Sequence, residues 1–303
     1  MVATSKDVLF TSDDMRSSSG TLKSLRRFCR RHPIEVVGAG WVALMFLLAA
    51  APSIFAPYGF NDQDLASRLQ GPSSAHWLGT DELGRDTLSR LIFGARVSTT
   101  VAVLSASFAG VVGVVAGLVA GYRGGWVDSV VMRLMDGLLA FPGLILALGV
   151  VAAVGGGVGP LMFAIGVGYI PAFTRITRGA VLGEMGKMYV ESAHAVGASP
   201  ARLMWRHLLP NIMSPLTVQA TVAIGVGIII EASLSFLGVG INPPESSWGL
   251  MLHASYGYIE QAPLLSISTG VTIMLTVMAL NFLGDGVRDW FDPQSRKAPG
   301  ESS

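Results

Sequence analysis

Residues 97–122 read VSTTVAVLSASFAGVVGVVAGLVAGY and contain no charged side chain. An α-helix needs roughly 20 mainly apolar residues to cross the hydrocarbon core of a bilayer, which is about 30 Å thick. This stretch is long enough to cross it once. It therefore predicts a transmembrane helix and an integral membrane protein.

The composition of the whole chain agrees with a protein that lies mostly in lipid. Of its 303 residues, 51% are hydrophobic and 14% are charged, and the mean hydropathy is +0.54. In an ordinary soluble domain roughly a quarter of the residues are charged. The net charge is only +1 and no nucleic-acid-binding motif occurs, so a nucleic-acid partner is excluded.

Five further stretches are long and apolar enough to span a membrane. They are residues 36–56, 130–154, 158–174, 213–238 and 264–283. Residues 137–174 form one uncharged run, which we divide at the glycine-rich stretch 155–160 because such a cluster does not suit a helix interior. The predicted fold class is all-α integral membrane, with about six transmembrane helices.

Lysine and arginine are distributed unevenly among the predicted connections. All but four of the 21 lie in the N-terminal segment, the second-to-third connection, the fourth-to-fifth loop or the C-terminal tail. Short cytoplasmic loops carry an excess of these residues. Both termini are therefore predicted to be cytoplasmic.

This map divides the chain into five regions. They are a basic cytoplasmic segment, 1–33; a first transmembrane helix, 34–57; an external loop, 58–96; a five-helix core, 97–286, which contains the cytoplasmic loop 175–212; and a cytoplasmic tail, 287–303. Apolar residues at helical spacing beside arginines predict that the end of the external loop forms an interfacial helix.

The motifs of an embedded enzyme are missing from the sequence. The pair Gly186-Lys187 is followed by Met188 and lacks the upstream glycine of a nucleotide-binding P-loop. Neither a His-Glu-x-x-His zinc motif nor a Gly-x-Ser-x-Gly nucleophile elbow occurs. We therefore predict that the chain is no enzyme, with no catalytic residue, no metal site and no cofactor of its own.

The loop 175–212 predicts a compact knob at the membrane surface, although it could also pack as a plain loop on its own bundle. A short helix around residues 187–196 meets Gly197, which favours the left-handed conformation that ends helices. Ser199 and Pro200 suit the N-cap and first turn of a second helix, which Pro210 is expected to end.

A few polar and small residues within the predicted spans need a reason, because a charge in the bilayer is costly. Arg133 and Asp136 are three residues apart, which predicts a mutual ion pair or snorkelling to the interface. Glu231 falls near the outer end of its span, where it either lines a vestibule or reaches interfacial water. Glycines at positions 113, 117 and 121 permit a close helix contact.

The cytoplasmic loop resembles the Glu-Ala-Ala loop of ABC importer permeases, and in detail the dipeptide, oligopeptide and nickel permease family. The residues that carry the resemblance are Tyr189, Glu191, Ala193, Gly197, Ala198, Ser199, Leu209 and Pro210. Ser192 and His194 depart from the usual alanine and arginine. The resemblance implies a type I ABC importer permease architecture in which this loop is a coupling helix that docks in a groove of an ATPase subunit.

Outer segments resemble the second, or C-type, permease of this family. In the external loop they are residues 76–81 with Arg85 and Asp86, and after span five they are residues 231–238 and 247–249. The resemblance implies that span five lines the translocation path, with Glu231, Ser233 and Ser235 as its polar candidates. It also implies an outer rim that suits a docking protein, with Asp81, Arg85, Asp86 and Trp248 as candidates.

The resemblance further implies partners and a location. The partners are a second homologous permease in a heterodimer, two ATP-binding subunits at the cytoplasmic face, an external substrate-binding protein and membrane lipid, with ATP and Mg bound by the ATPase subunits. The location is a bacterial plasma (inner) membrane, and the substrate is a di- or oligopeptide, with nickel or another small solute as the alternative.

Two other classes of function stay open from the residues alone. An ion-gradient-driven secondary transporter would need no ATPase and would show ionisable groups near mid-membrane and inverted repeats. Neither is clear in the sequence. A membrane scaffold without transport would leave the pattern of the cytoplasmic loop unexplained.

Overall fold

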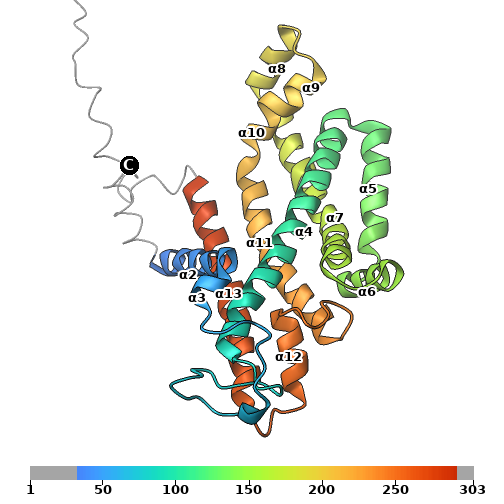
Figure 1. Cartoon of the computed structure of the whole chain (residues 1–303). Helices are drawn as coiled ribbons and strands as arrows, with labels where there is room; N and C mark the ends of the chain where they lie inside the picture. The colour runs from blue at the N-terminus through green and yellow to red at the C-terminus, as the bar shows by residue number, and fades with distance from the viewer. Residues whose placement is uncertain (1–32, 292–303) are drawn as a thin grey trace, which may run out of the picture.

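The computed structural model describes residues 33–291, so most of the predicted segments 1–33 and 287–303 lies outside it. The regular elements within this range are helices, and Figure 1 shows the longest of them running alongside one another. Short helices α8, α9 and α10 stand at one end of the molecule, and the external loop and α12 lie at the other end.

The helices that are long enough to span a membrane agree with the predicted fold class. They are α2 (Pro33–Ala50), α4 (Thr87–Arg123), α7 (Val158–Met185), α11 (Met213–Phe236) and α13 (Pro263–Phe291). A bent pair, α5 (Gly125–Leu139) and α6 (Gly143–Val154), makes a sixth span if the two helices cross together. The all-α membrane fold with five to six spans is thus confirmed.

The remaining elements are short and lie in the connections. They are α3 (Pro52–Phe55), the 3₁₀ turn η1 (Leu65–Ser67), α8 (Met188–Ala195), α9 (Pro200–Arg202), the π-helical turn η2 (Leu203–Leu208), α10 (Leu209–Asn211) and α12 (Trp248–Tyr256).

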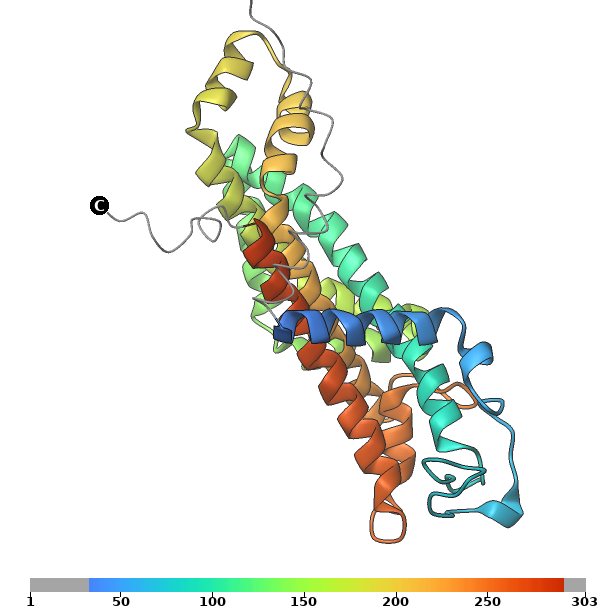
Figure 2. The ribbon, with the colours of Figure 1, turned by 90° about the vertical axis from the view of Figure 1, so that its left-hand side faces the viewer.

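The first predicted span ends earlier than expected. Helix α2 stops at Ala50, because a residue that precedes proline disfavours the helical conformation and Ala51 precedes Pro52. Figure 2 shows α2 lying across the other long helices and not alongside them. It is held to α13 by a hydrogen bond of 3.1 Å from Trp41 Nε1 to Thr276 Oγ1.

The expected interfacial helix is the beginning of α4. Asp86 caps α4 by accepting a hydrogen bond from the Ser89 amide at 2.8 Å, and the helix continues unbroken to Arg123. Leu91, Ile92 and Ala95 are buried within the fold. The apolar residues that predicted this helix pack inside the protein.

The third predicted span is broken near Pro142. Helices α5 and α6 meet at an angle of 87°. Proline has no amide hydrogen and cannot continue the helix, which ends at Leu139 before the new helix begins at Gly143. The angle between the two helices is therefore too large for a kink within one straight transmembrane helix.

Helices α4 and α7 form the closest pair in the bundle, as the glycine spacing predicted. A Cβ atom on Gly117 would lie 2.5 Å from Thr177 Cβ, and one on Gly113 would lie 2.6 Å from Phe173 Cβ. Real Cβ atoms do not approach so closely, so only glycine allows this separation. The C-terminal half of α7 is thereby fixed to α4.

Candidate functional site

The loop that precedes α11 folds into two short helical pieces joined by a glycine turn, as predicted. Helix α8 ends at Ala195, and Gly197 follows with φ +77°. The Ala198 amide donates to the Ala193 carbonyl at 3.0 Å, which closes the turn. Ser199 then caps α9 by accepting from the Arg202 amide at 3.4 Å.

The second helical piece ends at Asn211, one residue beyond Pro210, where the sequence predicted its end. The chain continues from α9 through η2 and α10 to Asn211. In η2 the Leu209 amide bonds to the Met204 carbonyl, five residues back, which widens the turn before Pro210. The Asn211 side chain donates to the His207 carbonyl at 2.6 Å and so satisfies one of the acceptors near the proline.

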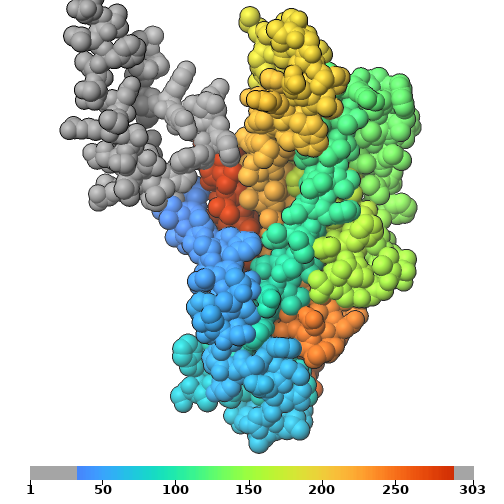
Figure 3. Space-filling model, turned by 45° about the horizontal axis from the view of Figure 1, so that its top comes forward, coloured from blue at the N-terminus to red at the C-terminus, as the bar shows by residue number. Residues whose placement is uncertain are grey.

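We call residues 188–211 the knob. Figure 3 shows it projecting beyond the rest of the molecule. Its apolar core is continuous with the long helices, because one cluster joins the knob to α4, α7 and α11: Leu118, Val181, Val190, Ala193, Leu203, Leu208, Ile212 and Leu216. A force applied to the knob therefore reaches three long helices through packed side chains.

The predicted coupling residues occupy different places in the knob. Glu191, Gly197, Ser199 and Pro210 are exposed, Tyr189, Ala198 and Leu209 are half-buried, and Ala193 is buried. Three large apolar residues that we had not predicted are also exposed: Met188 at 83%, Val196 at 85% and Trp205 at 52%. Exposed apolar side chains on a projecting element indicate a contact surface for another protein.

Tyr189 braces the knob against α7. Its hydroxyl donates to Glu184 Oε2 at 2.7 Å, and Lys187 Nζ lies 2.6 Å from Glu184 Oε1. Partial burial, together with the hydrogen bond to the Glu184 carboxylate and its negative charge, raises the pKa of Tyr189 to about 12. Tyr189 thus stays a neutral donor at physiological pH and fixes the orientation of α8.

The predicted ion pair between Arg133 and Asp136 is wrong. Asp136 on α5 instead pairs with Arg175 on α7 at 2.6 Å. A second pair joins the same two helices, with Arg178 Nη2 at 2.6 Å from Asp128 Oδ2. Helix α5 is therefore clamped to the part of α7 that leads into the knob.

The outer residues predicted to face a docking protein are buried. Asp81, Arg85, Asp86 and Trp248 are exposed by only 7%, 6%, 3% and 0%. The Asp81 carboxylate accepts hydrogen bonds from Arg85 Nε at 2.7 Å and from the Arg85 amide at 2.9 Å. These side chains organise the external loop and have too little exposed area to form a docking surface themselves.

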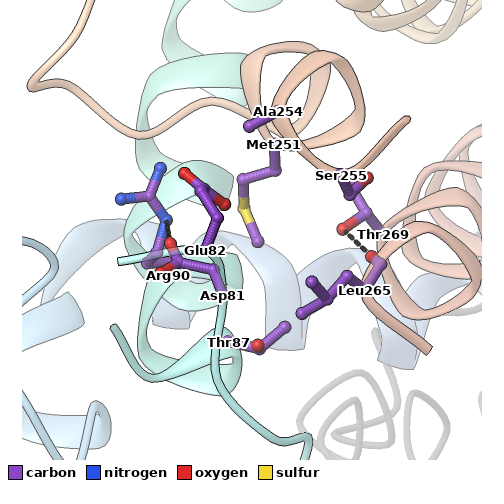
Figure 4. Close-up of a pocket in the computed structure, with 9 residues that line it drawn as sticks. All are labelled: Asp81, Glu82, Thr87, Arg90, Met251, Ala254, Ser255, Leu265 and Thr269. Carbon is purple, nitrogen blue, oxygen red and sulfur yellow. Dashed lines mark hydrogen bonds and ion pairs between the residues drawn. The ribbon is translucent and has the colours of Figure 1, made fainter. Parts of the chain in front are cut away.

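A small cavity of about 20 Å³ separates this loop from α12 and α13. Figure 4 shows Asp81, Glu82 and Arg90 on one side of it and residues of α12 and α13 on the other. Arg90 Nε lies 3.5 Å from Asp81 Oδ2. The hydroxyl of Thr87 is buried here without a hydrogen-bond partner among the described residues.

Glu231 is at the centre of a buried polar network. Its two carboxylate oxygens accept hydrogen bonds from Ser98 Oγ at 2.7 Å and Ser235 Oγ at 2.8 Å. Ser98 Oγ in turn accepts from the Trp248 amide at 3.2 Å, and Ser235 Oγ accepts from the Ile241 amide at 3.2 Å. The network therefore joins α4, α11 and the start of α12.

Two of the three predicted path residues do not reach a surface in this structure. Glu231 and Ser235 are both 0% exposed. Ser233 is half-exposed and donates to its own helix at the Ile229 carbonyl, 2.7 Å away. Within the described residues, no group of three or more His, Cys, Asp or Glu side chains is arranged to hold a metal ion.

Family models match most of the chain. Residues 113–297 match the model described as "Binding-protein-dependent transport system inner membrane component". Residues 22–72 match "N-terminal TM domain of oligopeptide transport permease C".

Curated permeases are similar in sequence to this chain over nearly their whole length. The glutathione transport system permease protein GsiD of Pectobacterium atrosepticum is 42% identical over 270 residues, which cover 89% of each chain. The probable peptide ABC transporter permease protein y4tQ of Sinorhizobium fredii is 42% identical over 89% of this chain and 92% of its own. The dipeptide transport system permease protein DppC of Alkalihalophilus pseudofirmus is 36% identical over 88% of each.

A solved structure shares the fold. The MetNI methionine ABC transporter, in an inward-facing conformation, matches with a TM-score of 0.56 and 21% identity over 66% of this chain and 95% of that chain. A transporter driven by an ion gradient does not belong to a binding-protein-dependent system, so that alternative was wrong. The chain belongs to the family of binding-protein-dependent transport system inner membrane components, as a permease-C-type, non-catalytic, multi-pass subunit of a bacterial ABC importer that works with ATPase and binding-protein partners.

Proposed function

We propose that this chain and a second homologous permease form the path by which di- or oligopeptides cross the bacterial plasma membrane. The similar permeases carry names for glutathione, dipeptide and peptide transport. Glutathione is itself a short peptide, so one substrate class covers all three names. The N-terminus is proposed to be cytoplasmic, in agreement with the distribution of Lys and Arg.

The observation that carries the proposal is the knob and its shared core with α4, α7 and α11. Two separate ATP-binding subunits, which hold the ATP and Mg, contact this knob and that of the partner permease. Transport requires that the subunits bind the knob differently in their two nucleotide states, since only differential binding shifts a conformational equilibrium. The exposed Glu191, Met188 and Val196 present the contact surface, and Gly197 sets its shape.

The path is proposed to follow one side of α11. Val222, Val226 and Ile229 are exposed by 37%, 37% and 43%, at the spacing of one helix face, and Ser233 continues the same stripe. The buried Glu231 and Ser235 hold this helix against α4 from behind. Their role on the path is thus to support its wall.

An external binding protein is proposed to dock on the loop between α2 and α4. Asp81, Arg85 and Asp86 give that loop a fixed shape, and Trp248 is buried close by against α4. The loop also bears two exposed apolar side chains, Leu65 at 64% and Trp77 at 69%. Such residues favour contact with another protein at the outer face.

Substrate and partners are tested together in two measurements. Purification of the tagged chain from its native membrane should recover a second permease and ATP-binding subunits. A strain that lacks this chain should lose uptake of labelled dipeptides and keep uptake of nickel. Loss of nickel uptake with normal dipeptide uptake would show that the substrate class is wrong.

A further inference from the structure

A hollow opens at the end of the molecule opposite the knob. Its volume is about 460 Å³, and its lining residues come from four segments: Phe60, Phe93, Arg96, Val97, Thr100, Val158, Pro244, Glu245 and Ser246. Pockets for small ligands measure roughly 300–1,000 Å³. The hollow is thus large enough for a short peptide.

Hydrogen bonds fix the walls of this hollow to α4. Ser246 Oγ donates to the Arg90 carbonyl at 2.9 Å, and Trp248 Nε1 donates to the Leu91 carbonyl at 3.0 Å. These bonds hold the segment that carries Glu245 beside the helix that carries Arg96. The backbone at Glu245 is therefore held beside the helix that carries Arg96.

Aromatic rings form the apolar side of the hollow. The ring centroids of Phe60 and Phe93 are 5.3 Å apart, in a tilted arrangement. The Phe60 carbonyl accepts a hydrogen bond from Arg90 Nη1 at 3.4 Å, which ties the external segment to α4. A bound apolar or aromatic side chain would contact these rings.

The two charged residues of the hollow have opposite signs and do not pair with each other. Neither Arg96 nor Glu245 forms an ion pair with any residue that the structure describes. Both side chains are exposed. A cation and an anion that line the same hollow, each free to bind, complement a molecule that itself carries both charges.

We propose that this hollow is an entry site for a short peptide with free termini. Arg96 binds the terminal carboxylate through two parallel hydrogen bonds, Glu245 binds the terminal ammonium group, and the Phe60 and Phe93 rings contact a side chain. The inference rests on the proposed peptide import and adds the place and the chemistry of recognition. The hollow receives the peptide after its release from the binding protein.

The test uses the complete transporter in proteoliposomes with peptide-loaded binding protein outside. Arg96→Gln and Glu245→Gln should each lower the initial rate of dipeptide uptake by about tenfold, as expected for the loss of one charge-assisted hydrogen-bonded contact. Glu260→Gln is the matched control, because Glu260 is an exposed carboxylate in the turn between α12 and α13 at the same end of the molecule. It should transport like the unmodified protein.

A second measurement separates peptide recognition from docking of the binding protein. The loaded binding protein should bind the variant complexes as tightly as the unmodified complex. Weaker binding would mean that the charges contact the binding protein, and this result would overturn the assignment. Normal dipeptide uptake by both variants would overturn it as well. If the unmodified complex imports no dipeptide at all, peptide import itself is wrong, and this outcome is distinct from a failure confined to the variants.

Discussion

At the scale of single residues, Gly197 has the most demanding backbone conformation of the knob. Its φ of +77° is disfavoured for residues with a Cβ atom, and most strongly for β-branched ones. A side chain would meet no other atom, because nothing lies within 4 Å of an ideal Cβ there. The cost of a substitution is therefore a backbone cost alone.

We predict that Gly197→Val lowers uptake by about tenfold or more, since strain of about 1–3 kcal/mol shifts the turn away from its docked shape. Gly197→Asn is the control, because asparagine tolerates the left-handed region better than valine does. Uptake of labelled dipeptide and the amount of inserted protein are measured for both. Normal transport by the valine variant would remove Gly197 from the coupling mechanism.

Substitutions of Glu231 test whether the buried network depends on the hydrogen bonds of this side chain or on its negative charge. Glu231→Ala leaves the hydroxyls of Ser98 and Ser235 without their acceptor, at a cost of about 1–3 kcal/mol for each buried polar group left unpaired. Glu231→Gln keeps the size and one acceptor oxygen. We expect a clearly lower thermal unfolding midpoint in detergent for the alanine variant and a nearly unchanged midpoint for the glutamine variant. An equally large loss in both would mean that the charge is required.

At the scale of helices, the seam between α4 and α7 connects the outer half of the bundle to the knob. Gly117→Leu would force the helices apart, because its Cβ would lie 2.5 Å from Thr177 Cβ. Overpacking of this kind costs about 1–3 kcal/mol. Gly110→Ala is the matched control, since its nearest neighbour, Phe173, would be at an ordinary 3.6 Å. The leucine variant should unfold at a lower temperature and the alanine variant should not; equal stability of the two would contradict this account of the seam.

The sequence predicted the helices and turns better than it predicted the side-chain contacts between them. The presence of the long helices, the turn at Gly197 and the break near Pro142 follow from local rules for apolar runs, glycine and proline. The pairing of Asp136 with Arg175 depends on how α5 packs against α7, so spacing within one helix pointed to the wrong partner.

Burial was equally hard to predict. Asp81 and Arg85 are charged residues in a loop, so we expected their side chains to be exposed. Instead they form an ion pair with each other inside the loop. The hollow near Arg96 could not be predicted, because its lining comes from segments far apart in the sequence.

At the scale of the whole molecule, the side of the membrane on which the knob lies depends on the bent pair α5–α6. If the pair crosses the membrane, the external loop and the knob lie on opposite sides. If it did not cross, α4 and α7 could not both span the membrane, because they run in the same direction: Gly113 of α4 lies against Phe173 of α7, and Gly121 lies against Val181. The 87° bend at Ala140–Pro142 makes this the decisive point of the topology.

Labelling of single cysteines decides between these topologies. The chain has one cysteine, so Cys29→Ser gives a background without thiols. In that background Trp77→Cys, at a position 69% exposed, and Val196→Cys, at a position 85% exposed, report on the external loop and on the knob. We expect a membrane-impermeant thiol reagent to label residue 77 in intact cells and residue 196 only in inverted vesicles. Labelling of both from the same side would contradict this arrangement, and the knob could then not be reached by cytoplasmic ATP-binding subunits.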